Sequence, residues 1–105
     1  MLSFGSEHEY EIRISPIMGI PLKDLDFEVS TYVYSNRAVT FKKTDTEHIK
    51  PVDNDTYMVV IDTENALKIG RGKEFAKITL HIPNNHFKDG IQTVILKELE
   101  TGWEF

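Results

Sequence analysis

The chain is 105 residues long, contains no cysteine, and carries a formal net charge of −5 from 12 Lys and Arg against 17 Asp and Glu. With 40% hydrophobic residues it can bury a core, so we expect one folded domain spanning residues 1–105. The lack of cysteine excludes disulfides, thiolate zinc sites and a cysteine nucleophile. The negative charge argues against a nucleic-acid partner, because affinity for phosphates rests on clustered Lys and Arg.

The sequence gives no sign of membrane insertion or export. No apolar run approaches the ~20 residues that a membrane-spanning helix needs. The N-terminal residues Met-Leu-Ser-Phe-Gly lack the basic region and apolar stretch of a signal peptide. We therefore expect no membrane partner and take the cytoplasm as the default location.

Apolar residues that alternate with polar ones predict strands in the first half of the chain. The first strand covers residues 9–14 and ends at Ser15-Pro16, since proline cannot donate to a ladder. Residues 27–34 form the clearest strand, and residues 35–37 are typical of a tight hairpin turn into a strand over 38–43. The polar stretch 44–55 has room for a short edge strand around His48 and Ile49.

The second half predicts further strands and one helical segment. Residues 56–62 are apolar on both faces, which is typical of a central strand. Residues 63–69 form the helical turn, with Thr63 as its cap and Gly70 as its end. Residues 73–82 and 91–99 are the last two strands, and the short aromatic tail 101–105 follows them.

This order of elements predicts an all-β fold, namely an immunoglobulin-like antiparallel β-sandwich of about seven strands with one short helical turn near residues 63–69. A small barrel is the alternative. The predicted core between the two sheets consists of Ile12, Phe27, Val29, Val33, Val59, Ile61, Ile78 and Leu80.

The polar residues form no recognisable catalytic or metal-binding pattern. The four histidines lack the local spacing of a zinc site, and we interpret them as surface residues. The run Asp53-Asn54-Asp55 lacks the spaced ligands of a calcium loop and is explained by turn formation. No serine lies in a glycine elbow. We therefore expect no catalytic residue, no metal and no cofactor.

Aromatic residues are the best candidates for an interaction surface. In the strand 27–34, Tyr32 and Tyr34 fall on the face opposite Phe27, and Phe75 could join them across the sheet. The alternative is that this face is partly covered within the fold. Trp103 and Phe105 could dock on a neighbouring element or fray.

Several segments resemble a known group of proteins. They are Pro21 to Val29, Asp62-Thr63 leading into Ala66 to Gly72, Ile82-Pro83-Asn84, and Phe87 to Gly90. Across residues 12–101 the chain resembles short phage or prophage proteins of gut bacteria, whose immunoglobulin-like β-sandwiches are similar to the N-terminal domains of baseplate and tail proteins. The resemblance implies a non-enzymatic virion or assembly component that works in multiple copies, located in the virion or, during assembly, in the bacterial cytoplasm.

Two functions follow as expectations. The first is a structural interaction module that docks to identical subunits or to a larger phage structural protein, with oligomers possible. The second is a small carbohydrate- or ligand-binding sandwich that stacks its ligand on Tyr32, Tyr34 and Phe75.

Overall fold

The computed structural model describes residues 4–96 and 98–105. Within them the strands are β1 (His8–Arg13), β2 (Asp26–Tyr32), β3 (Val39–Lys42), β4 (Ile49–Pro51), β5 (Thr56–Ile61), β6 (Lys73–Pro83), β7 (Ile91–Ile95) and β8 (Leu99–Glu104). The helical segments are α1 (Thr63–Ile69) and two short 3-10 helices, Leu22–Asp24 and Ser35–Arg37. None of the helices in the described part of the chain is long and apolar enough to cross a membrane.

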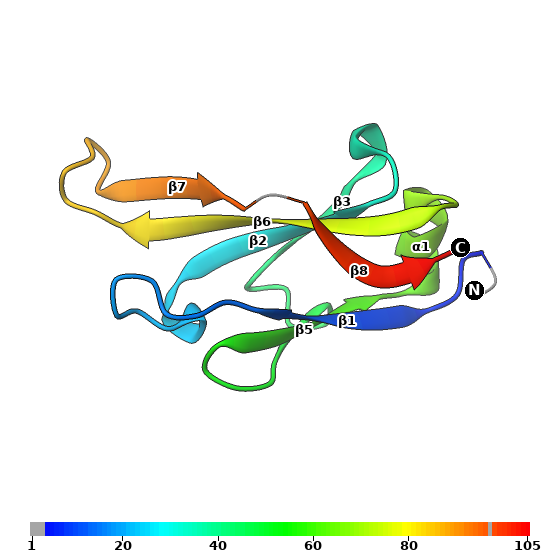
Figure 1. Ribbon diagram of the computed structural model, residues 1–105, viewed down its shortest axis with the longest axis horizontal. Helices are drawn as coiled ribbons and strands as arrows, with labels where there is room; N and C mark the ends of the chain where they lie inside the picture. Colours follow the sequence, from blue (N-terminus) through cyan, green and yellow to red (C-terminus); the bar gives the residue numbers. More distant parts are fainter. Residues whose placement is uncertain (1–3, 97) are drawn as a thin grey trace.

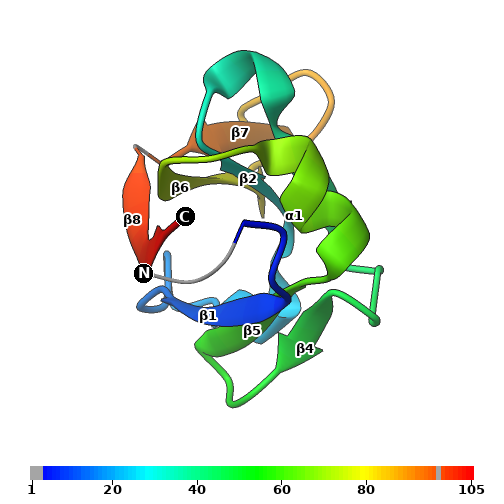
Figure 2. The same ribbon diagram turned by 90° about the vertical axis from the view of Figure 1, so that its right-hand side faces the viewer.

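The strands form two antiparallel sheets that pack face to face. The smaller sheet has the order β1-β5-β4, and the larger has the order β3-β2-β6-β7, with β8 also paired to β6. Figure 1 shows the two sheets along their length, and Figure 2 shows α1 closing one side of the sandwich and β8 closing the other. The predicted antiparallel β-sandwich is confirmed.

The long strand β6 organises the larger sheet. β2 pairs with one of its edges, while β7 and β8 follow each other along the opposite edge. The predicted last strand, residues 91–99, is therefore corrected to two strands, and the aromatic tail belongs to β8. The division is accompanied by a change of register, because Ile95 pairs with Thr79 whereas Leu99 pairs with Ala76.

The core lies between the sheets where the strand alternation places it. Seven of the eight predicted core residues are at most 3% exposed. Val33, the eighth, is partly buried and packs against the core from just beyond the end of β2.

The helical segment has the predicted extent but a different cap. α1 spans Thr63–Ile69, and the side chain of Asp62, not Thr63, accepts a hydrogen bond from the backbone N–H of Asn65 at 2.9 Å. Gly70 ends the helix at a φ of 100°, a conformation that favours glycine. The expected tight turn at residues 35–37 is a 3-10 turn within a longer connection between β2 and β3.

Candidate functional site

Of the two tyrosines in the predicted aromatic surface, Tyr32 is buried and Tyr34 is exposed to solvent. Tyr32 is only 3% exposed, whereas Tyr34 is 57% exposed. The Tyr32 hydroxyl donates a hydrogen bond to Glu98 Oε1 at 2.5 Å, and its ring lies 6.2 Å from that of Phe75. The prediction that Tyr32 faces solvent is wrong, because the residue is buried and the C-terminal segment, which pairs with β6, brings Glu98 to its hydroxyl.

The surroundings of Tyr32 also keep its hydroxyl group protonated. Removal from water, followed by the hydrogen bond and the negative charge of Glu98, raises the pKa of Tyr32 to about 12. The phenol therefore remains a donor at neutral pH. Since Phe75 is itself partly buried, the three rings do not make one open stacking platform, and their role as an interaction surface stays a prediction.

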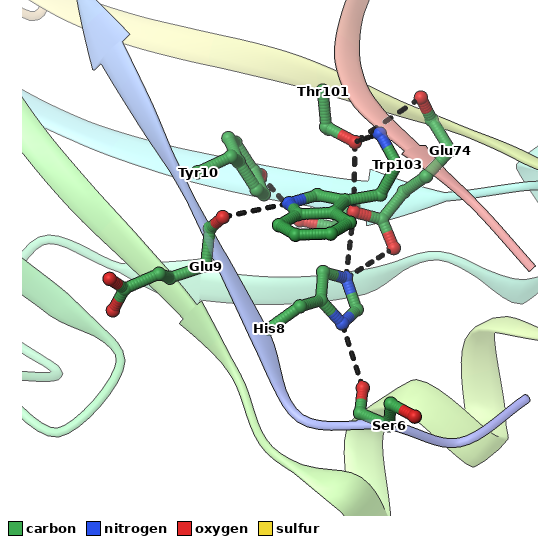
Figure 3. Close-up of polar contacts among 8 residues, drawn as sticks. Ser6, His8, Glu9, Tyr10, Glu74, Thr101 and Trp103 are labelled. Atoms are coloured by element: carbon green, nitrogen blue, oxygen red, sulfur yellow. Dashed lines mark hydrogen bonds and ion pairs between the residues drawn. The ribbon is translucent and has the colours of Figure 1, made fainter. Parts of the chain in front are cut away.

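A second group of polar residues lies inside the sandwich (Figure 3). His8 on β1 and Glu74 on β6 meet at 2.8 Å between His8 Nε2 and Glu74 Oε2, and both side chains are 0% exposed. The Thr101 hydroxyl donates to Glu74 Oε1 at 3.0 Å, and His8 Nδ1 lies 2.9 Å from the carbonyl oxygen of Ser6. The pair connects the two sheets through a charge-assisted hydrogen bond.

The protonation of His8 follows from these partners. Burial by itself would lower the pKa of His8. The hydrogen bond to Glu74 and the one to the Ser6 carbonyl outweigh burial, so the pKa is raised. The imidazole is thus stabilised in its charged form next to the Glu74 carboxylate.

Aromatic residues of the C-terminal segment cover this buried pair. Trp103 Nε1 donates to the carbonyl oxygen of Glu9 at 2.7 Å, which joins β8 to β1 (Figure 3). The His8 ring centroid lies 5.6 Å from Trp103 and 4.6 Å from Phe105. Trp103 therefore docks on a neighbouring element, and the His8–Glu74 pair is closed to solvent.

The sequence pattern predicts His8 as a surface residue and assigns no role to Glu74. Counted with their backbone atoms, His8 is 5% exposed and Glu74 is 0% exposed, so the surface interpretation of His8 is wrong. The signal was present in the alternation, because Glu74 shares the inward phase of Ala76 and Ile78. A carboxylate in such a position requires a partner within the core.

A third group lies where β4 begins, near the start of α1. His48 Nδ1 lies 2.9 Å from Asp45 Oδ2, and His48 Nε2 lies 2.9 Å from Asp62 Oδ2. The imidazole stacks on Phe41 at 4.3 Å between ring centroids, with 7° between the planes. We call these three polar residues, Asp45, His48 and Asp62, the His48 clamp.

The described residues offer no clear ligand site. Across residues 4–96 and 98–105, no group of three or more His, Asp or Glu side chains is placed to hold a metal ion. An open hollow of about 280 Å³ on the larger sheet is lined by Asp26, Phe27, Glu28, Lys42 and His81. Its lining mixes both charges and assigns no ligand chemistry.

The outer edges of the sheets differ in how they are protected against pairing with another chain. Exposed strand edges are commonly blunted by charges or proline. Four of the five edge strands in the described chain carry such residues: Glu9, Glu11 and Arg13 in β1, Lys42 in β3, Lys50 and Pro51 in β4, and Glu100 and Glu104 in β8. β7, with the sequence Ile-Gln-Thr-Val-Ile, has neither charge nor proline.

The hydrogen-bonding groups of β7 alternate between β6 and solvent. Leu96 N–H donates to the Ile78 carbonyl at 2.8 Å, and Asn84 N–H donates to the Gly90 carbonyl at 2.9 Å. In an antiparallel ladder this register directs every second residue of β7 toward β6. The backbone groups of Ile91, Thr93 and Ile95 consequently point away from the sheet, where no described strand pairs with them. One of these groups, the Ile91 N–H, donates to Asp89 Oδ1 in the preceding turn at 3.1 Å.

The side chains on this edge are also apolar. Ile91 is 44% and Ile95 is 61% exposed, and Phe87 in the preceding turn is 47% exposed. This surface is not predicted from the sequence, because residues 91–99 are predicted there as a single strand.

Comparison with known proteins gives no relative. A scan against protein-family models gives no match, and searches of curated proteins and of solved structures give none either.

Proposed function

We propose that this chain is a non-enzymatic interaction module that docks a partner strand on the free edge of β7. The observation that carries the proposal is the combination of outward-pointing backbone groups and an uncharged, proline-free sequence in β7. Proteins that recognise extended partners use such edges, where main-chain hydrogen bonds supply affinity and alternate side chains supply specificity.

The buried polar residues support a non-catalytic role. The His8–Glu74 pair is the arrangement most like a general base, yet both side chains are 0% exposed and lie beneath Trp103 and Phe105. A catalytic base must come within hydrogen-bond reach of its substrate. The geometry of this pair therefore favours a structural role, in which it links the two sheets.

The biological setting that we propose follows the resemblance in the sequence. We propose a component of a phage or prophage tail or baseplate, present in the virion or, during assembly, in the bacterial cytoplasm. Particles of this kind present many copies of each component, so contacts that are weak individually become effective together. The carbohydrate-binding alternative has less support, because Tyr32 is buried and its hydroxyl is bonded to Glu98.

The proposal is tested by selecting extended peptides against the protein. A library of random peptides displayed on a carrier is panned on the wild type, and the selected binders are measured on Thr93→Lys. Thr93 is exposed and its backbone points outward, so the lysine should leave the fold intact and reduce binding at least tenfold.

Thr46→Lys is the matched control, since Thr46 is an exposed turn residue remote in sequence from β7. Binding should be unchanged in this variant, and circular dichroism should show the same strand spectrum for all three proteins. Binders that tolerate Thr93→Lys as well as Thr46→Lys would overturn the proposal.

A further inference from the structure

We infer that β7 pairs with β7 of a second copy of this chain. The two strands are antiparallel and are related by a two-fold axis at Thr93. The inference rests on the proposed function, because it uses the same edge, and it adds the identity of the partner. Figure 1 shows β7 at the margin of the molecule, with no other element beyond it.

The geometry of β7 is self-complementary. A two-fold axis at Thr93 pairs Thr93 with its own copy and Ile91 with Ile95 of the second copy. These are the three residues whose N–H and C=O groups point away from β6, so each of these groups faces a partner. The Ile91 N–H, which donates to Asp89 Oδ1 at 3.1 Å, exchanges that acceptor for the Ile95 carbonyl of the second copy. A closed symmetric contact of this kind uses the same surface on both copies.

The side chains fit the same register. Ile91, Thr93 and Ile95 lie on one face of the sheet, so pairing would bring the exposed Ile91 of each copy beside the exposed Ile95 of the other. Cross-strand pairs of β-branched residues stabilise antiparallel sheets. The contact thus covers apolar surface that is now open.

The distribution of charge also favours β7 as the edge at which two copies associate. The chain has a net charge of −5, so two copies repel each other in general. β7 contains no charged side chain, and Asp89, just before it, has its carboxylate bonded to the Ile91 N–H, whereas β1 and β8 would each bring several glutamates close to their own copies. β7 is therefore better suited than β1 or β8 to pair with its own copy.

The contact is small, and we expect it to be weak. One pair of five-residue strands buries far less than the roughly 1,600 Å² of a standard stable interface. Dimers should accordingly form at about 0.1–1 mM protein, which corresponds to a binding free energy of roughly 4–5.5 kcal/mol. Sedimentation velocity over this range should show a monomer–dimer equilibrium that Thr93→Lys abolishes and Thr46→Lys retains.

Cross-linking tests the register. The chain has no native cysteine, so single-cysteine variants react at one site only. Thr93→Cys should cross-link to itself through a short bismaleimide. In the two-fold register the two copies of residue 91 lie four residues apart along the strands, about 14 Å, beyond the reach of that reagent. Ile91→Cys should therefore cross-link to Ile95→Cys in a mixture of the two variants, and neither should cross-link to itself.

The outcomes separate this inference from the proposed function. A wild type that stays monomeric at 1 mM, or Thr93→Cys that cross-links no faster than Thr46→Cys, would overturn the two-fold dimer. Self-cross-linking of Ile91→Cys would show another register or a parallel pairing and overturn it as well. In each case, peptides that bind wild type and lose affinity for Thr93→Lys would leave the proposed strand-docking function intact.

Discussion

The imidazole of His48 lies between two carboxylates, and both of its ring nitrogens face an acidic oxygen. Partial burial alone would lower the pKa of His48, but the hydrogen bonds to Asp62 and Asp45 outweigh it and raise the pKa. The pKa of Asp62 is lowered, first by the hydrogen bond to His48 and then by the Asn65 N–H. The clamp thus ties the residues before β4 to the cap of α1.

These pKa shifts determine how the stability contributed by the His48 clamp depends on pH. A histidine whose pKa is raised by folding contributes stability that is complete below its ordinary pKa of 6.5 and is lost as the pH rises through the folded value. For Asp62, the contribution is present above its ordinary pKa of 3.8 and is lost as the pH falls through the folded value. The clamp stabilises the fold most between these two ordinary values.

We predict that the melting temperature falls more steeply with rising pH in the wild type than in His48→Gln. Between about pH 6 and pH 9 the difference should amount to about 2–5 °C. Glutamine can still form hydrogen bonds but does not titrate. His86→Gln is the control, because His86 is exposed, and it should follow the wild type. An unchanged slope in His48→Gln would contradict the assignment, while some slope should remain from His8.

Tyr32 and Tyr34 allow a matched comparison within a few residues. Tyr32→Ser should reduce the free energy of unfolding by about 2–4 kcal/mol, because it removes a ring that is 3% exposed and leaves Glu98 without its donor. Tyr34→Ser, at 57% exposure, should change it by less than about 0.5 kcal/mol. Urea unfolding measures both, and equal small effects would show that the C-terminal segment does not cover Tyr32 in solution.

At the scale of the element, β6 holds the larger sheet together. It pairs with β2 on one edge and with β7 and β8 on the other, and its inward side chains alternate with outward ones over eleven residues. Removal of a buried side chain from β6 should therefore destabilise the whole sheet, whereas removal of an outward side chain from β7 should not.

This difference is measurable with two isoleucines. Ile78→Ala should lower the free energy of unfolding by about 2–5 kcal/mol, because Ile78 is 0% exposed and a cavity would remain. Ile95→Ala should lower it by about 0.5 kcal/mol or less in dilute solution, since Ile95 is 61% exposed. A comparable loss in both variants, measured by thermal unfolding, would contradict the observed burial of β6.

At the scale of the whole molecule, the described chain should fold without a metal ion. Any ion that binds the native state raises the melting temperature by mass action. In the part of the chain that the structure describes, no group of three or more His, Asp or Glu side chains is placed to hold a metal ion. We therefore predict that EDTA, millimolar calcium and zinc each leave the melting temperature unchanged, and a rise of several degrees with either ion would contradict this.

The sequence by itself determined the local elements of this protein. The alternation from Phe27 to Val33 predicted β2 and its inward face, and the segment Thr63–Ile69 was predicted as the helix that the structure contains. These predictions succeed because the period of a strand or helix is a property of neighbouring residues, and a buried face records it as a repeat of apolar side chains.

The tertiary structure alone decided which faces are covered and which edge is free. Tyr32 meets Glu98 and His8 meets Glu74 across 66 residues each, and Trp103 meets Glu9 across 94 residues. Alternation assigns a side chain to a face but carries no information on what packs against that face, because the partner comes from a distant segment. For the same reason β7 was recognisable as a strand from its sequence, while its outer edge became visible as free only when all pairings of β6 were known.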